Sequence, residues 1–316
     1  MKYILCLIIC LFHSISFSQT NILKDQGFAR GFEVYMVEDG VPNLPLTVKK
    51  VISVNPKEVN KPEWQLAQWN NYNNRMEFAD YTLLNDQHLY ETKGGNKFLI
   101  SPVDNMVMLG LSTSSEYGKN EVSPDNPRKE GQKWPHLLIS QTMNEHAVKV
   151  SDYKSISMKV DYCINSIKDN HEKGTFNKNL HSSQFQWFIS VNNKNRESKG
   201  YGDYFWFGFS FYDFRYLFSP FYANVDTNTT GKFIYMPDMR EVLGEGNSTG
   251  IGKTKSFYYE INKQLEKAFN TAKENGFLKD TNWQDLYIGH TNIGWEVTGS
   301  FDVQATISNL GIIVKP

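Results

Sequence analysis

Apolar and polar residues alternate with a period of two along most of the chain from about residue 97 onward. A period of two places successive side chains on opposite faces of the backbone, as in a β-strand with one buried face. The runs are rich in Phe, Tyr, Val and Ile, and clusters of Asn, Gly, Asp and Pro separate them. This pattern predicts an antiparallel β-sandwich rather than alternating β–α units. The predicted strands lie near residues 97–101, 106–112, 136–141, 155–163, 183–191, 203–213, 232–236, 285–290 and 301–314, after two earlier ones near 32–40 and 46–54.

One segment departs from the alternation. Between Phe257 and Asn275, apolar residues recur at steps of three and four, which is the spacing of an amphipathic α-helix. Gly276 follows, and glycine commonly ends a helix because it adopts the left-handed conformation required there. The sequence therefore predicts an all-β sandwich of the jelly-roll type with one amphipathic helix near the C-terminus. The stretch from Tyr117 to Lys133 is predicted to be an exposed loop.

The first eighteen residues have the features of an export signal. Lys2 precedes an apolar run from Tyr3 to Phe12, and the small residues Ser16 and Ser18 precede a predicted cleavage site before Gln19. The run is too short for a membrane-spanning helix, which needs about 20 residues. The sequence predicts a secreted or periplasmic protein without a membrane span after cleavage. We divide it into a signal peptide (1–18), N-terminal strands and loops assigned to the sandwich (19–96) and the jelly-roll core (97–316).

Composition narrows the classes of partner. The chain has 316 residues, with 33 Lys and Arg against 34 Asp and Glu, and 14 % of its residues are aromatic. The aromatic content excludes a disordered chain, and the near-zero net charge argues against a nucleic-acid partner. Cys163, the one cysteine beyond the predicted signal, is predicted to be a half-buried strand thiol. No spacing of Cys and His predicts a metal site, so no cofactor is expected, although a structural Ca²⁺ stays open.

Two neighbouring predicted strands carry the clearest functional pattern. Four phenylalanines at alternate positions of 203–213 predict a core face, which leaves aromatic residues with polar edges on the opposite face. Such rings suit stacking on sugars, whose C–H faces are apolar. On the strand 183–191, two glutamines share the corresponding face and offer amide donors and acceptors. Together the strands predict a groove for a polysaccharide or oligosaccharide, unless a loop or the helix buries that face. The groove residues are Gln184, Gln186, Tyr204, Trp206 and Tyr212.

Three further side chains could supply chemistry. His136 lies in an otherwise apolar strand, where a structural, hydrogen-bonded histidine is the alternative. Glu296 has the opposite parity to Trp295, so it points away from the core as either an acid or a solvated carboxylate. Arg215 follows Asp213 by two residues, and it forms either a local ion pair or a bidentate contact with the carboxylate or sulfate of an acidic sugar.

The order of the last elements resembles that of the concanavalin A-like lectin/glucanase jelly rolls, and most closely glycoside hydrolase family 12. Here it appears as YYEINKQLEKAFNTAKENG, then IGWEV, then FDVQATISNLGIIV. The resemblance implies that the late-strand Glu296 is the acid/base. The family also has a nucleophilic carboxylate on an earlier strand, but the matching segment here, YFWFGFSFYD, contains no glutamate. A retaining hydrolase needs two carboxyl groups about 5–5.5 Å apart.

These features predict an exported enzyme that degrades a polysaccharide. A lyase ranks slightly ahead of a hydrolase, since His136 and a groove tyrosine could exchange protons while Arg215 or a glutamine neutralises a uronate. A hydrolase would need Asp203 or Asp213 beside Glu296, and strand parity disfavours Asp213. The alternatives are a non-catalytic, lectin-like glycan-binding protein and a structural surface subunit. The predicted catalytic residues are His136, Tyr204 and Glu296, and the predicted substrate-binding residues are Gln184, Gln186, Trp206, Tyr212 and Arg215.

Overall fold

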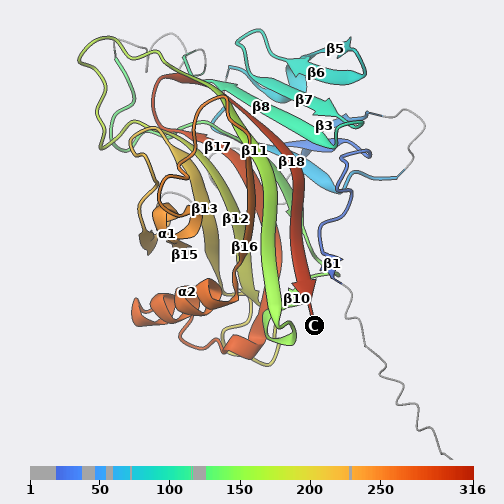
Figure 1. Cartoon of the computed structure of the whole chain (residues 1–316), viewed down its shortest axis with the longest axis vertical. Helices are drawn as coiled ribbons and strands as arrows, with labels where there is room; N and C mark the ends of the chain where they lie inside the picture. Colours follow the sequence, from blue (N-terminus) through green and yellow to red (C-terminus); the bar gives the residue numbers. More distant parts are fainter. Residues whose placement is uncertain are drawn as a thin grey trace, which may run out of the picture.

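The computed structural model describes residues 19–37, 47–54, 60–71, 73–114, 116, 126–227 and 230–316. The predicted export signal and most of the predicted loop 117–133 lie outside these residues. In the described part, long strands form two sheets that stack face to face, as Figure 1 shows. No helix among the described residues is long and apolar enough to cross a bilayer.

The first layer, sheet A, pairs its strands antiparallel. Its members in spatial order are β16 (Lys255–Glu260), β11 (Ser155–Asp169), β18 (Phe301–Lys315), β8 (Met106–Ser112), β7 (Lys97–Ser101), β6 (Gln87–Glu91) and β5 (Asp80–Leu84). The short strand β1 (Thr20–Asn21) also pairs with β18.

The second layer, sheet B, carries the candidate site. Its strands pair antiparallel except for two parallel pairs, β13 with β15 and β2 with β4. Its members in spatial order are β14 (Tyr222–Val225), β15 (Phe233–Met236), β13 (Tyr204–Asp213), β12 (Ser183–Asn193), β17 (Leu286–Val297), β9 (His136–Thr142), β4 (Trp64–Trp69), β2 (Phe32–Val37) and β3 (Val48–Ile52). The short β10 (Val148–Lys149) pairs with β17, so residues 19–96 contribute strands to both sheets.

The predicted all-β sandwich with a late helix is confirmed, with one shift of boundary. Helix α2 spans Asn262–Glu274, but residues 257–260, at the start of the predicted helix, belong to β16. In that strand Phe257 is buried while Tyr258 is 57 % exposed, because pairing with β11 alternates their directions. The sequence interpretation also missed β4, β5, β6 and β14. The short helices are α1 (Met239–Leu243), η1 (Met76–Phe78), η2 (Val150–Asp152) and η3 (Trp283–Asp285).

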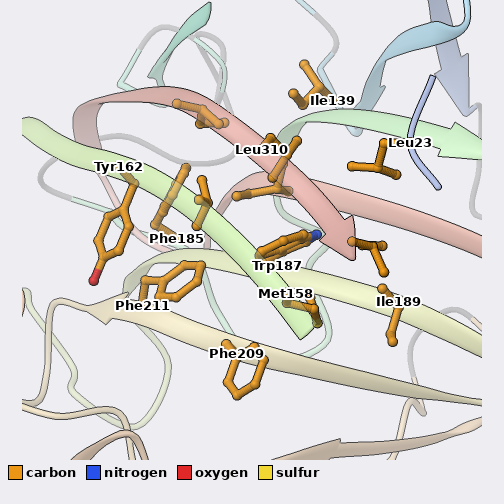
Figure 2. Close-up of a cluster of buried hydrophobic side chains, with 14 of the residues drawn as sticks. Leu23, Ile139, Met158, Tyr162, Phe185, Trp187, Ile189, Phe209, Phe211 and Leu310 are labelled. Carbon is orange, nitrogen blue, oxygen red and sulfur yellow. The ribbon is translucent and has the colours of Figure 1, made fainter. Parts of the chain in front are cut away.

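Aromatic side chains fill the space between the sheets. The predicted phenylalanine face of β13 is buried, from Phe205 through Phe211. The ring of Tyr162 on β11 stacks on Phe211 with 4.5 Å between centroids, which joins the two sheets. Each such buried side chain contributes about 1.5–3 kcal/mol through removal of apolar surface from water. Figure 2 shows part of this cluster, with Phe185 and Trp187 of β12 gathered beside Met158 and Tyr162 of β11.

Helix α2 packs on the core side of sheet B. Its apolar stripe, which includes Leu265 and Phe269, belongs to the same buried cluster as the phenylalanines of β13. The hydroxyl of Tyr235 donates to the amide oxygen of Gln264 at 3.2 Å, and the ring of Tyr235 stacks on Phe207. Since Phe207 points into the core, α2 covers that side and leaves the opposite face of β13 uncovered by the helix.

A stacked pair of histidines stabilises the connection between β11 and β12. The rings of His171 and His181 lie 4.7 Å apart. His181 accepts the Asn177 backbone N–H at Nδ1 and donates from Nε2 to the Arg128 carbonyl. Both ring nitrogens are therefore engaged in the neutral state. Arg128 itself is only 7 % exposed and donates to four backbone carbonyls around it, so the predicted loop 117–133 is not exposed at this residue.

We expect the protein to lose stability as the pH falls below about 6.5. Burial lowers the pKa of His181, and burial lowers the pKa of His290 on β17 to about 4. Because these pKa values are lowered in the folded state, the unfolded chain binds protons at a higher pH than the folded protein does. The free energy of unfolding therefore decreases as the pH falls below 6.5, the ordinary pKa of a histidine. Urea unfolding at pH 7 and pH 5 measures this, and His290→Gln should show a smaller difference. A free energy of unfolding that is equal at both pH values would contradict the expectation.

Candidate functional site

The face of sheet B that points away from the core, here called the outward face, carries most of the predicted site. On β12, the core residues from Phe185 to Val191 alternate with Gln184, Gln186 and Phe188 on the outward side, where Gln184 is partly exposed but Gln186 and Phe188 are covered by their neighbours. On β13, Trp206 is partly exposed and contacts three rings on the same face. These are Tyr204 at 5.7 Å, Phe188 at 6.3 Å and His290 at 5.9 Å between centroids. The predicted division of both strands into a core side and an aromatic outward side is therefore present.

The strand register brings together five outward residues from distant parts of the sequence. Gln184 pairs with Glu296 on one side and with Asp213 on the other, and Glu296 pairs with His136. His136 in turn pairs with Trp69 of β4. We call this set, Trp69–His136–Glu296–Gln184–Asp213, the Glu296 row. Residues directly opposite on neighbouring strands have Cβ atoms about 4.5–5.5 Å apart, so adjacent members can interact.

His136 and Glu296 form a pair suited to proton transfer. The Nε2 atom of His136 lies 3.4 Å from Oε2 of Glu296, and both side chains are partly exposed. The Nδ1 atom of His136 lies 3.0 Å from the carbonyl oxygen of Trp134, which only accepts, so Nδ1 carries a hydrogen. In the neutral ring Nε2 is then an acceptor, and it faces the carboxyl group of Glu296. An imidazole and a carboxyl group are both able to take up or release a proton during a reaction.

Asp213 lies at the end of the Glu296 row but is fully engaged. Its carboxylate accepts from Ser182 at 2.7 Å, from Gln184 Nε2 at 2.8 Å, and from Arg215 Nε at 2.9 Å and Nη2 at 2.6 Å. Burial would raise the pKa of Asp213, but the hydrogen bonds and charge of Arg215 outweigh it and hold the pKa below its usual range. Arg215 therefore forms the local ion pair, the alternative to binding an acidic sugar.

A bulge in β13 overturns the parity argument for its last residues. The register between β12 and β13 shifts by one residue between Phe185 and Gln186. Tyr212 consequently pairs with Phe185 and packs against the buried Trp295, with 6.4 Å between centroids. Burial, followed by the charge of Asp213, raises the pKa of Tyr212 to about 12. The strand parity that placed Tyr212, and not Asp213, on the outward face is wrong here, because the extra residue exchanges their sides, and Asp213 is itself buried there.

The other predicted groove residues lie at the opposite end of the outward face. Asn192 of β12 pairs with Tyr204, eight residues along the strand from Gln184. At about 3.3 Å per residue this separates Tyr204 from the Glu296 row by roughly 26 Å. Tyr204 therefore cannot exchange a proton in concert with His136 or Glu296, contrary to the grouping predicted from sequence. Asp203 lies at the same distant end, bound to Lys232, so it is no partner for Glu296. We call Tyr204, Trp206, Phe188 and His290 the aromatic end.

Small residues lie between the two ends. Gly208 pairs with Phe188, and a Cβ atom at Gly208 would approach the Phe188 ring to 2.3 Å. Glycine there allows the ring to lie across the neighbouring strand. Gln186 pairs with Ser210 on β13, and the buried Ser210 hydroxyl has no hydrogen-bond partner among the described residues. In this middle section the Ser210 hydroxyl is therefore a buried polar group that the described residues leave unpaired.

Sequence reasoning missed several residues around His136 and Glu296. The rings of Trp69 and Trp134 lie 5.8 and 5.9 Å from that of His136. Burial, then the charges of Asp226 and Glu296, raises the pKa of Tyr222 on β14, so the Glu296 charge is felt on that edge strand. Parity in WQLAQW could have separated the buried Trp64 from the outward Trp69. Nothing in the sequence indicated an electrostatic effect of Glu296 on Tyr222.

Metal binding has no support in the part of the chain that the structure describes. No group of three or more His, Cys, Asp or Glu side chains there could hold an ion. Cys163 is half-buried on β11 with no disulfide.

Comparison with known proteins gives remote structural similarities. No protein-family model matches the sequence, and no curated protein matches it. A native family 12 xyloglucanase from Bacillus licheniformis is 11 % identical, with a TM-score of 0.40 over 75 % of this chain and 97 % of that one. The endoglucanase Cel12A from Rhodothermus marinus is 8 % identical, with a TM-score of 0.39 over 75 % and 96 %. The xyloglucanase domain of NopAA from Sinorhizobium fredii, in complex with cellobiose, is 10 % identical, with a TM-score of 0.37 over 75 % and 98 %.

Proposed function

We propose that this protein acts on a polysaccharide, which it binds along the outward face of sheet B from the Glu296 row to the aromatic end. The observation that carries the proposal is the distribution of side chains on this face. Aromatic rings lie at both ends, at Trp69 and at Trp206, with the partly exposed amide of Gln184 and the largely covered Gln186 and Ser210 between them. Rings stack on the apolar faces of sugars, and amides and hydroxyls bond to sugar rims.

The reaction we propose is a β-elimination at the Glu296 row. In such a step the carbon next to a uronate carboxylate loses a proton, its electrons form a C=C bond, and the glycosidic oxygen leaves with a proton. In the His136–Glu296 pair, whose Nε2 and Oε2 atoms lie 3.4 Å apart, one group can take the proton from the carbon while the other gives a proton to the leaving oxygen. Gln184, beside Glu296, can donate to the substrate carboxylate only if its amide releases Asp213.

Hydrolysis by two carboxylates has less support in the same row. The residue directly across from Glu296 on β12 is Gln184, an amide. The next carboxylate, Asp213, has its oxygens occupied by Arg215, Ser182 and Gln184. A second carboxyl at about 5–5.5 Å, or at 6.5–9.5 Å with room for a water molecule, must be free to react. This occupancy ranks elimination ahead of hydrolysis and also favours a second candidate, glycan binding without cleavage.

We also propose that the protein is exported. The support is the N-terminal sequence, in which an apolar run from Tyr3 to Phe12 follows Lys2 and precedes small residues at Ser16 and Ser18. Export would bring the outward face into contact with extracellular polysaccharides.

The test is a panel of polysaccharides incubated with the purified protein. Alginate, polygalacturonate, xyloglucan and laminarin are followed by ultraviolet absorbance of unsaturated uronates, by reducing ends and by retardation in glycan gels. Elimination produces both ultraviolet absorbance and reducing ends. Reducing ends alone would replace the lyase with a hydrolase, and retardation without products would establish binding alone. A protein that neither cleaves nor is retarded by any polymer would overturn the proposed function.

A further inference from the structure

A hollow of about 520 Å³ adjoins the aromatic end of sheet B. Three turns surround it: residues 199–203 before β13, residues 231–232 before β15, and residues 276–280 after α2. Each turn brings one lysine to the lining, namely Lys199, Lys232 and Lys279. Gly202 and Gly231 have positive φ angles, and a Cβ atom at either would meet nothing within 4 Å, so the two turns leave open space.

The hollow is continuous with the aromatic end. The Nζ atom of Lys232 lies 5.2 Å from the centroid of the Tyr204 ring, and Tyr204 contacts Trp206. Tyr201, which also lines the hollow, is 54 % exposed. A sugar chain that stacks on Trp206 and Tyr204 would therefore reach the lysines with its next residues.

The lysines that line the hollow outnumber the acidic residues there. Lys232 is neutralised by Asp203 at 2.7 Å. Among the described residues, Lys199 and Lys279 form no ion pair, and Asp280 is the remaining acidic residue of the lining. The hollow thus has one positive charge in excess, carried on flexible side chains at its rim. Arg215, the cation expected from sequence to bind an acidic sugar, is bound to Asp213 instead.

We propose that this hollow binds an anionic sugar residue, through its carboxylate or sulfate, so that the polysaccharide is acidic. The inference rests on the proposed function, because it places the anionic residue on the same chain that crosses Trp206 toward the Glu296 row. Lys199 and Lys279 supply the charge, and Tyr204 and Tyr201 supply the rings. An acidic polymer is also what an elimination requires, since that step removes a proton next to a carboxylate.

The test compares Lys199→Gln/Lys279→Gln with Lys263→Gln/Lys267→Gln. The control removes the same charge from the surface of α2, away from the hollow. The probes are polygalacturonate, its methyl-esterified form, chondroitin sulfate and desulfated chondroitin, each in affinity gels at low and high salt. We expect the first variant to bind the acidic polymers about fivefold more weakly, as about 1 kcal/mol from two exposed charges implies. The control should bind like the parent, and the esterified polymer should bind weakly.

The outcomes separate the two proposals. Preference for polygalacturonate over its esterified form identifies a carboxylate as the anionic group, and preference for chondroitin sulfate over desulfated chondroitin identifies a sulfate. Equal retardation by the esterified polymer, or equal binding by the two double variants, would overturn the acidic-sugar inference while the proposed function stands. Failure of the parent to be retarded or to act on any polysaccharide, neutral or acidic, would overturn the proposed function itself.

Discussion

Replacement of Glu296 by glutamine is expected to slow cleavage of the polysaccharide about 10²–10⁴-fold, the usual contribution of a general acid or base. Glutamine keeps the size of the side chain, and its amide can still bond to Nε2 of His136, now 3.4 Å from Oε2. What it loses is the ability to hold and return a proton. The initial rate of ultraviolet absorbance on the best substrate of the panel measures the loss.

Binding should survive this substitution, which separates chemistry from recognition. We expect the Glu296→Gln protein to be retarded in glycan gels like the parent, because Trp206 and Tyr204 of the aromatic end lie roughly 20 and 26 Å away along the strands. Glu266→Gln is the matched control, since Glu266 lies on the surface of α2. If the Glu296→Gln protein cleaved at the parental rate, Glu296 would not be the acid–base group.

Replacement of Asp213 by asparagine is expected to lower the free energy of unfolding by about 3–5 kcal/mol, as breaking a buried ion pair does. Asp213 is buried and accepts hydrogen bonds from Ser182, Gln184 and Arg215. An asparagine would leave the guanidinium of Arg215, with 22 % of its side chain exposed, without its counter-charge. It would also present an NH₂ group to at least one of these donors.

Urea unfolding at pH 7 tests this effect against Asp203→Asn. Asp203 also pairs with a cation in sheet B, at 2.7 Å from Lys232, but both side chains are about one-third exposed. A pair in that environment contributes less than about 1 kcal/mol. If both variants lost the same free energy of unfolding, the Asp213–Arg215 pair would not stabilise the fold more than the exposed Asp203–Lys232 pair does, which would contradict the expectation.

The sequence predicts those features of the fold that depend only on the alternation of apolar and polar residues within one strand. The phenylalanines from Phe205 to Phe211 are buried, and Trp206 points outward, because a strand alternates its side chains wherever its pairing is regular. The bulge opposite Phe185 breaks this rule for Tyr212 and Asp213, and nothing in the composition of the strand signals it. Residues 257–260 fit both the spacing of a helix and the alternation of a strand. They form a strand because they pair with β11.

The candidate site was predicted only in part, because it depends on register between strands. The Glu296 row joins Trp69, His136, Gln184, Asp213 and Glu296 from five strands. Alternation states which face a residue occupies, but not which residue of a neighbouring strand lies opposite it. For this reason the sequence predicts Tyr204 beside His136, although the two lie at opposite ends of the face.

Radical footprinting of the protein with and without a bound polysaccharide tests most directly whether the outward face of sheet B is the binding surface. Trp206, Tyr204 and Trp69 report on that face, and Tyr258, which is 57 % exposed on β16 of sheet A, serves as the internal reference. Our account predicts that the polysaccharide protects the three outward rings from oxidation and leaves Tyr258 unchanged. Protection of Tyr258 with unchanged oxidation of Trp206 and Trp69 would place the sugar on another surface and contradict it.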